Sequence, residues 1–258
     1  MSGNSLPYET VGAGGRPVVF LHGGGFGGAM WRPVAETLTG RRCLLLDLPG
    51  HGAARAIPFG SFDRVACRVA QTIEGACRGK ADIVGLSLGG YVGLSLLLRR
   101  PAVVGRAVLS GFSIAPFPNP WRNRIVARAL SPVATTGWFR RRAARAMNAD
   151  AFLNEAAIPK ISRKALIQVM ESALAFDPGA QALAGIETPT LALAGGREHG
   201  AICESVAQLA RLSPACAARI APNLGHGWSG EDPQLFAATV AAWLDNAPLP
   251  QTLLDPTQ

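Results

Sequence analysis

One pentapeptide of the sequence has the residue types and the spacing that nucleophilic catalysis needs. Gly85-Leu86-Ser87-Leu88-Gly89 places a serine two residues from a glycine on either side. An apolar segment precedes it at residues 81–85, and a helix-like segment follows at residues 89–100. In a tight turn from strand to helix, the glycines make room for the backbone, and the serine hydroxyl projects above the sheet. The pattern therefore predicts that Ser87 is a nucleophile. An ordinary serine in a glycine-rich turn is the alternative.

A nucleophilic serine needs a base, because its hydroxyl keeps its proton at neutral pH. The sequence offers four histidines, which are His22, His51, His199 and His226. His22 ends an apolar segment, and His51 lies in the turn of residues 47–52. His226 lies in a loop after the last predicted strand, so it follows Ser87 in the chain.

The elements that would position these side chains alternate between apolar strands and helices. The sequence predicts strands at residues 16–22, 41–47, 81–85, 106–110, 190–194 and 217–221. It predicts helices at residues 62–77, 89–100 and 236–246. Strands that are apolar throughout and separated by helices are typical of a parallel sheet covered on both faces. We therefore expect an α/β fold, with a mostly parallel central sheet flanked by helices.

Residues 112–186 break this alternation. The segment is rich in proline, has helical stretches between the prolines, and is too long for a simple crossover. We interpret it as a helical cap inserted into a core domain made of residues 1–111 and 187–258. Ligands bind at the carboxyl ends of the strands in open α/β sheets, so we expect the cap to lie over that edge.

The predicted cap carries most of the positive charge of the chain. The net charge is +8, and residues 111–185 contain ten Lys or Arg against four Asp or Glu. A solvated arginine-rich helix face is the simplest explanation, and a cap that attracts anionic substrates is the alternative. Nucleic-acid binding is less favoured, because no binding motif accompanies the charge. The aromatic residues of the cap could line an acyl pocket, but we expect most of them to form its core: Phe112, Phe117, Trp121, Trp138, Phe139 and Phe152.

Composition limits the class of protein further. Hydrophobic residues make up 48% of the chain and charged residues 16%, which is typical of a globular protein. No apolar run reaches the roughly 18 residues of a membrane span, and residues 1–7 lack the regions of a signal peptide. The five cysteines form no C-x-x-C pair, so neither a disulfide framework nor a zinc site is expected. We expect a cytoplasmic protein with a small-molecule substrate and no metal or organic cofactor. We expect no nucleic-acid or membrane partner, and the oligomeric state is left open.

One glycine-rich segment matches a competing motif. Gly23, Gly25 and Gly28 satisfy G-x-G-x-x-G after a predicted strand, and Asp47 ends the next strand. This spacing is typical of dinucleotide binding in α/β sheets. We favour this interpretation less, because a nucleotide site leaves Ser87 without a role.

Beside the serine pentapeptide, three segments resemble the α/β-hydrolase family, and the resemblance covers nearly the whole chain. Residues 8–24 resemble the first strands of that family and the loop after them, in which His22 matches a structural histidine. Residues 47–52, Asp-Leu-Pro-Gly-His-Gly, resemble its next loop, in which His51 is structural as well. Residues 225–236 resemble its histidine loop and last helix.

This resemblance implies the base and the acid of a catalytic triad. His226 matches the general base of the family, which follows the serine and the acid in the chain. The acid is usually an aspartate in a turn after the penultimate strand. Here that turn reads Gly-Gly-Arg-Glu, so Glu198 takes the place, and a glutamate can also orient an imidazole. Glu204 is the nearby alternative, and a surface glutamate without a role is another.

The same family roles predict the rest of the site and its reaction. The oxyanion of a tetrahedral intermediate needs backbone donors. We expect the amides of Leu88 and Gly24, with Gly25 as a third donor. The resemblance implies hydrolysis of a carboxylic ester or a lactone through an acyl-enzyme on Ser87. Hydrolysis of a C–C bond and acyl transfer to another acceptor use the same triad and stay open, and a non-catalytic binding protein of this fold is the alternative from another class.

Overall fold

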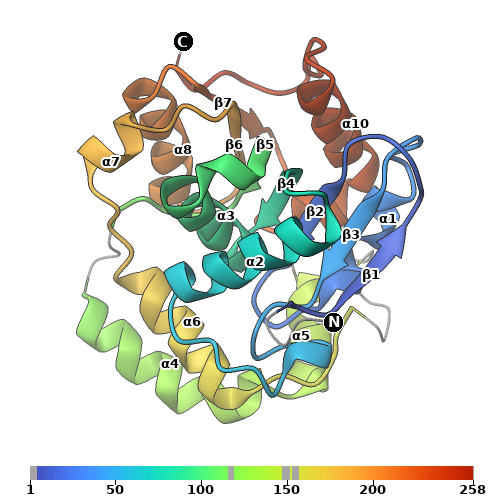
Figure 1. The fold of residues 1–258 in the computed structure, drawn as a ribbon. Coiled ribbons are helices and arrows are strands. Elements are labelled where there is room, and N and C mark those ends of the chain that lie inside the picture. The colour runs from blue at the N-terminus through green and yellow to red at the C-terminus, as the bar shows by residue number, and fades with distance from the viewer. Residues whose placement is uncertain (1–4, 116–118, 147–151, 153–156, 258) are drawn as a thin grey trace.

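A central sheet runs through the protein between layers of helices (Figure 1). The computed structural model describes residues 5–115, 119–146, 152 and 157–257. Within these residues, seven strands pair in the order β1-β3-β2-β4-β5-β6-β7. β1 runs antiparallel to β3, and every other pair in the described sheet is parallel. The predicted α/β fold with a mostly parallel sheet is therefore confirmed.

The strands are short and mostly apolar, as the sequence predicted. Their bounds are β1 (Tyr8–Val11), β2 (Val18–Leu21), β3 (Cys43–Leu46), β4 (Ala81–Leu86), β5 (Val104–Ser110), β6 (Thr190–Gly195) and β7 (Cys216–Ala221). Every residue of β2, β3, β4 and β6 is buried, because helices cover both faces of the sheet there.

The strand order changes direction between β2 and β4, which are parallel neighbours in the sheet. The chain leaves β2 towards β3 on one side, and it leaves β4 towards β5 on the other side. The two loops therefore diverge at the carboxyl edge, and open α/β sheets bind ligands beside such a point. Leu21 pairs with Gly85 in register, so the loop that begins at His22 and the turn at Ser87 start side by side.

Two hydrophobic cores hold helices to the two faces of the sheet. α2 (Phe62–Ala76), α3 (Leu88–Arg99) and α8 (Gly200–Leu212) contribute to one core. α1 (Arg32–Ala35) and α10 (Pro233–Leu244), which follows the short α9 (Trp228–Glu231), contribute to the other. α2 begins after Ser61, whose side chain accepts a hydrogen bond from the Arg64 amide at 3.3 Å.

Four helices lie between β5 and β6 in the part of the chain that the structure describes. They are α4 (Pro120–Ala134), α5 (Gly137–Ala146), α6 (Arg163–Leu174) and α7 (Ala180–Ala184). Figure 1 shows α4 at the rim of the molecule, beside α6. The helical content agrees with the expected cap, whereas its boundaries at residues 112 and 186 stay a prediction.

The expectation that most cap aromatic residues form a core is wrong for the two outer helices. Phe112 and Phe152 are buried, but Trp121, Trp138 and Phe139 are exposed. α4 turns small residues inwards, so its large side chains face solvent. Phe117, the sixth residue of that prediction, lies outside the described residues.

Candidate active site

Ser87 lies in a strained turn between β4 and α3. Its backbone has φ 54° and ψ −111°, which is rare for a residue with a side chain. Two hydrogen bonds hold the turn: the Ser87 amide donates to the Ser110 carbonyl at 2.8 Å, and the Gly89 amide donates to the His22 carbonyl at 3.1 Å. The serine is partly exposed at the carboxyl edge of the sheet. This is the local structure that the G-x-S-x-G pattern predicted.

The two glycines of that pattern are fixed by contacts with backbone atoms. A Cβ on Gly85 would lie 2.3 Å from the Gly89 carbonyl oxygen. A Cβ on Gly89 would lie 2.0 Å from the Leu21 carbonyl oxygen. Backbone atoms cannot rotate away as a side chain does, so either substitution would displace α3 from the sheet. The spacing of the motif is thus a packing requirement of the turn.

His226 and Glu198 meet in the loops that follow β7 and β6. His226 Nδ1 lies 2.6 Å from Glu198 Oε2, and Glu198 Oε1 accepts a hydrogen bond from the Gly195 amide at 2.9 Å. The Glu198 side chain is fully buried, whereas the other candidate acid, Glu204, is exposed and pairs with Arg211. A carboxylate at Nδ1 keeps the proton on that nitrogen and leaves the lone pair of Nε2 free to act as a base.

Gly111 connects the histidine to the serine. It directly follows Ser110, which binds the Ser87 amide, and a Cβ on Gly111 would lie 2.8 Å from His226 Cε1. The imidazole ring therefore lies against the segment that also holds the serine turn. Among the hydrogen bonds of the described residues there is none between Ser87 Oγ and His226. Such bonds are often long until a substrate binds.

The expected oxyanion donors lie beside the serine. Leu88 is the first residue of α3, so its amide has no acceptor within the helix. The backbone of Gly23 passes the serine, since a Cβ there would lie 3.9 Å from Ser87 Cβ, and the following Gly24 is partly exposed. Gly25 is different, because its amide donates to His51 Nε2 at 3.2 Å. Gly25 is thus not free to be a third donor, contrary to the expectation from sequence.

Two buried histidines form hydrogen bonds to the loop that contains Gly23, Gly24 and Gly25. His22 Nδ1 donates to the Gly23 carbonyl at 2.8 Å, and His22 Nε2 accepts from the Leu48 amide at 2.9 Å. His51 Nδ1 lies 3.1 Å from the Pro49 carbonyl, opposite the nitrogen that binds Gly25. Burial lowers the pKa of His22 to about 4 and that of His51 to about 3. Both rings are therefore neutral near pH 7, as suits structural residues that accept from amides.

A buried arginine of α5 also contacts the loop, and the sequence analysis did not single it out. Arg140, on α5, donates from Nη1 to the carbonyl oxygens of Gly25 and Pro159, each at 2.7 Å. It also donates from Nη2 to the Thr135 carbonyl at 3.3 Å. Burial lowers the pKa of this guanidinium, which still carries its charge at neutral pH. With His51 on its amide and Arg140 on its carbonyl, Gly25 is held from both sides.

Two further residues position the histidine loop. Trp228 Nε1 donates to Ser110 Oγ at 3.0 Å, which ties this loop to the end of β5. Glu231 accepts from the Gly225 amide at 3.2 Å and forms an ion pair with Arg197. Trp228 follows His226 by two residues, so its place in the motif was a signal that sequence analysis could have used. The ion pair joins segments 34 residues apart, which no local pattern reveals.

The dinucleotide interpretation of the glycine-rich loop would place Asp47 on a ribose, but Asp47 is hydrogen bonded within the protein. The two carboxylate oxygens of Asp47 accept from the amides of Gly28 and Ala53, at 2.9 and 2.8 Å. A Cβ on Gly28 would lie 2.6 Å from the Leu45 carbonyl oxygen, so this glycine packs on β3. The G-x-G-x-x-G spacing is therefore accounted for by packing of the loop.

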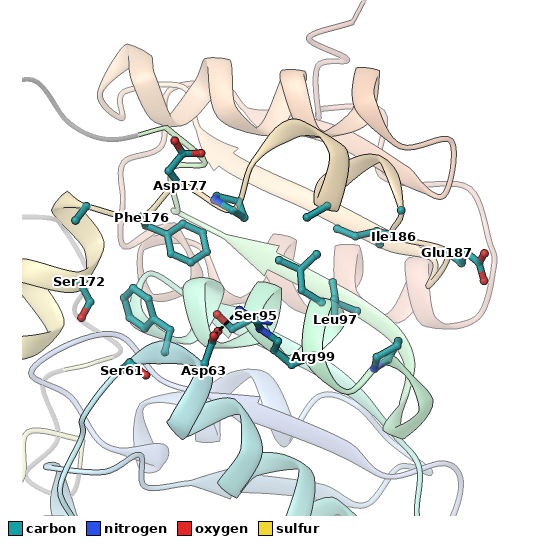
Figure 2. Close-up of a pocket in the computed structure, with 17 residues that line it drawn as sticks. Ser61, Asp63, Ser95, Leu97, Arg99, Ser172, Phe176, Asp177, Ile186 and Glu187 are labelled. Carbon is teal, nitrogen blue, oxygen red and sulfur yellow. Dashed lines mark ion pairs between the residues drawn. The ribbon is translucent and has the colours of Figure 1, made fainter.

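A separate cavity of about 720 Å³ lies between α2, α3 and the segment after α6 (Figure 2). Figure 2 shows Phe176 and Asp177 on one side of it, and an ion pair of 2.8 Å between Asp63 and Arg99 on another. Its described lining includes serines but no histidine or lysine that could activate a hydroxyl. The acyl-transfer chemistry considered for Ser87 therefore has no counterpart here.

The strand order and the turn from β4 through Ser87 into α3 are those of the α/β-hydrolase fold. The model of the alpha/beta hydrolase family matches residues 18–239, and the chain belongs to this family. It is thus a hydrolase, as the resemblance of the four sequence segments predicted.

Individual relatives agree with this family. An AB hydrolase superfamily protein of Gibberella zeae is 27% identical over 97% of this chain and 87% of its own length. A pimeloyl-[acyl-carrier protein] methyl ester esterase of Chromobacterium violaceum is 44% identical, but over 38% of this chain and 37% of its own length. A thermophilic esterase of Thermogutta terrifontis superposes with a TM-score of 0.79 over 93% of both chains, at 20% identity. At that identity, the superposition shows the common fold alone.

Proposed function

We propose that this hydrolase cleaves a carboxylic ester or a lactone through an acyl-enzyme on Ser87. The observation that carries the proposal is the 2.6 Å contact between His226 Nδ1 and the buried side chain of Glu198. Ser87, at φ 54°, has the strained backbone of a nucleophile turn. The acid fixes the tautomer of the base, and the turn presents the nucleophile. No other group is needed to activate a hydroxyl for attack on a carbonyl.

The reaction has two steps, and His226 Nε2 carries the proton in both. In the first, Nε2 takes the Ser87 proton while Oγ bonds to the carbonyl carbon. The amides of Leu88 and Gly24 hold the oxyanion, and Nε2 then gives the proton to the leaving alkoxide. In the second, Nε2 takes a proton from water, whose oxygen attacks the acyl carbon, and Ser87 Oγ leaves with that proton. Ester and water thus give acid and alcohol.

The relatives support an ester as the bond cleaved. The Chromobacterium violaceum relative is a methyl ester esterase, and so is a relative of Nitrosomonas europaea, which is 37% identical over 41% of this chain and 40% of its own length. Both matches cover less than half of each chain, so they do not identify the acyl group of the substrate of this protein. The proposal below depends on the chemistry of the site alone. We propose a small-molecule ester, with an anionic acyl group as the alternative that the arginine-rich cap would favour.

The test is turnover of p-nitrophenyl esters from acetate to decanoate by the wild type and by Ser87→Ala. We expect turnover by the wild type and a loss of at least about 1,000-fold in kcat for the variant, since the nucleophile is removed. The profile of rate against chain length measures the size of the acyl pocket.

A wild type without ester turnover would contradict the proposal, and labelling by a fluorophosphonate then separates the alternatives. A label on Ser87 would indicate a working triad with another bond as its target, such as a C–C bond, or with an acceptor other than water. The absence of a label would favour a binding protein of the same fold.

A further inference from the structure

The outward face of α4 is apolar, although nothing in the described structure covers it. Ala127 and Ser131 are the residues of this helix that are buried. Its large apolar side chains are instead between 47% and 66% exposed, and they are Trp121, Ile125, Val126, Leu130 and Val133. A helix that packs on a core normally buries such residues. A contiguous set of them in solvent marks an interaction surface.

Arginines accompany these apolar residues along α4 and α5, and neither helix carries an acidic residue of its own. Residues 120–146, which span α4 and α5, contain seven arginines and no Asp or Glu. Arg128 pairs with Glu171 at 2.7 Å, and Arg140 is buried. The other five are exposed, and they are Arg122, Arg124, Arg141, Arg142 and Arg145. A surface with this charge repels a second copy of itself, so its partner is anionic.

α5 adds a hollow with the chemistry of an anion site. Trp138, Arg141, Arg142, Arg145 and Ala146 line a cavity of about 470 Å³. Guanidinium groups bind phosphate through paired N–H donors, and an exposed indole ring is favoured at the boundary between water and lipid. The Trp138 side chain is 67% exposed, which makes it available for such a contact.

We propose that the outer helices of the cap dock on the surface of an anionic phospholipid bilayer. The docking face consists of the five exposed apolar residues of α4, the indole of Trp138, and five arginines of α4 and α5, which are Arg122, Arg124, Arg141, Arg142 and Arg145. Apolar and aromatic residues interleaved with arginines are typical of helices that lie in the interface of a membrane. A bilayer surface fits an outward-facing helix without a matching groove, and its phosphates complement the arginines.

This docking is peripheral. No helix of the described residues is long and apolar enough to cross a membrane. The expectation from sequence that no membrane is a partner rested on the lack of a membrane-spanning segment and on the concentration of charge in residues 111–185. The docking face depends instead on which side of α4 faces outwards. The proposal is independent of the proposed esterase activity, because none of its residues belongs to the catalytic site.

The test is co-sedimentation with vesicles of phosphatidylcholine alone or mixed with phosphatidylglycerol. Ser87→Ala protein is used, so that lipid hydrolysis cannot alter the vesicles. We expect binding to the anionic vesicles at about 0.1 M salt, weaker binding at about 1 M, and little binding to phosphatidylcholine alone. Tryptophan fluorescence should shift to shorter wavelength on binding, because Trp121 and Trp138 leave water.

Three sets of substitutions separate the contributions. Arg122→Gln, Arg124→Gln and Arg142→Gln together should lower the partition coefficient on the order of 100-fold, since each charge near the surface contributes. A control with the same loss of charge on the core domain should leave binding within a factor of two or three: Arg78→Gln, Lys80→Gln and Arg211→Gln. The apolar set should also weaken binding, by at least about 10-fold: Trp121→Ser, Ile125→Ser and Leu130→Ser.

Two results would overturn the proposal. The first is no binding to anionic vesicles at low salt. The second is binding that the apolar set does not change, or that the control weakens as much as the arginine set does. Dependence on the arginines alone would instead indicate a polyanion, such as an acidic protein or a nucleic acid, that needs no apolar contact.

Discussion

The edge of the sheet around Ser87 and the helix α4 both use small residues for close packing, but they differ in where their large side chains lie. At the edge, glycines bring backbone against backbone, with no room for a methyl group at Gly85 or Gly89. In α4, small residues also face inwards, but the large side chains of Trp121 and Ile125 are left in solvent. The first arrangement fixes a geometry for chemistry. The second leaves a surface for a partner.

Arg140 joins these two regions. It belongs to the cap by its place on α5, yet its hydrogen bonds at 2.7 Å end on Gly25, in the loop that carries the Gly24 amide. Burying a charged guanidinium is costly unless its donors are paired. We therefore interpret the hydrogen bonds of Arg140 as a means of positioning the loop and not only of covering it. We therefore expect substitutions at the edge of the sheet to change kcat and stability more than substitutions on the exposed surface of α4 and α5.

The largest effect is expected from the buried acid. Glu198→Gln places an amide at His226 Nδ1, which favours the tautomer that carries its proton on Nε2 and cannot accept the serine proton. We expect kcat to fall by about 10³- to 10⁴-fold with the fold intact. The matched control is Glu204→Gln, on the exposed glutamate that pairs with Arg211. Ester kinetics on both variants make the comparison, and equal rates would remove Glu198 from the account.

The next effect concerns the packing of the serine turn. Gly89→Ala places a methyl group 2.0 Å from the Leu21 carbonyl, so α3 must move and carry Ser87 with it. We expect a loss of about 3 kcal/mol in the free energy of unfolding and at least about 100-fold in kcat. Gly200→Ala is the control, because a Cβ at Gly200 meets nothing within 4 Å. Urea unfolding and ester turnover are the measurements, and a Gly89→Ala protein as active as Gly200→Ala would contradict the packing argument.

A smaller effect is expected where the cap meets the loop. Arg140→Met keeps the apolar stem but removes the donors to the Gly25 carbonyl, so the neighbouring Gly24 amide loses its orientation. We expect kcat to fall by roughly 10-fold, with a smaller change in KM, because the oxyanion forms after binding. Arg141→Met, on an exposed neighbour of the same helix, should change neither. A rise in KM alone would place Arg140 in substrate binding instead of positioning.

The effect that is smallest at neutral pH is a pH dependence of stability. His22 and His51 have folded-state pKa values of about 4 and about 3, below the 6.5 of an unfolded chain. Between pH 6.5 and 4 the unfolded state binds more protons, so stability is full above this range and is lost as the pH falls through it. Each histidine contributes a slope of up to about 1.4 kcal/mol per pH unit.

The measurement is urea unfolding between neutral and mildly acidic pH. The slope should be shallower in His51→Gln, which removes one of the two contributions. An unchanged slope in the His51 variant would show that this ring does not stay neutral in the folded protein.

Local patterns predicted the edge of the sheet well. The apolar segments at residues 190–194 and 81–85 became β6 and β4 with changes of one residue at an end, since burial on both faces leaves a continuous apolar signal. The position of Glu198 in the loop after β6 came from the resemblance to the α/β-hydrolase family and not from local pattern. The structure places this glutamate, and not Glu204, against His226.

The cap was harder to predict for a physical reason. Apolar and basic residues alternate along α4 so that the sequence does not show which face is buried, and packing against α6 decides it. Arg140 and Gly25 are 115 residues apart, and their contact depends on how α5 enters the fold. Both findings rest on tertiary contacts, which overrule local pattern.

The most direct test of the central claim is to map fluorophosphonate labelling of the intact protein by peptide mass spectrometry. A fluorophosphonate reacts with a serine that a base has activated. We expect one label, on Ser87, that is lost in Ser87→Ala and forms at least about 1,000-fold more slowly in His226→Ala. A label on another serine, or labelling of Ser87 at an unchanged rate without His226, would contradict it.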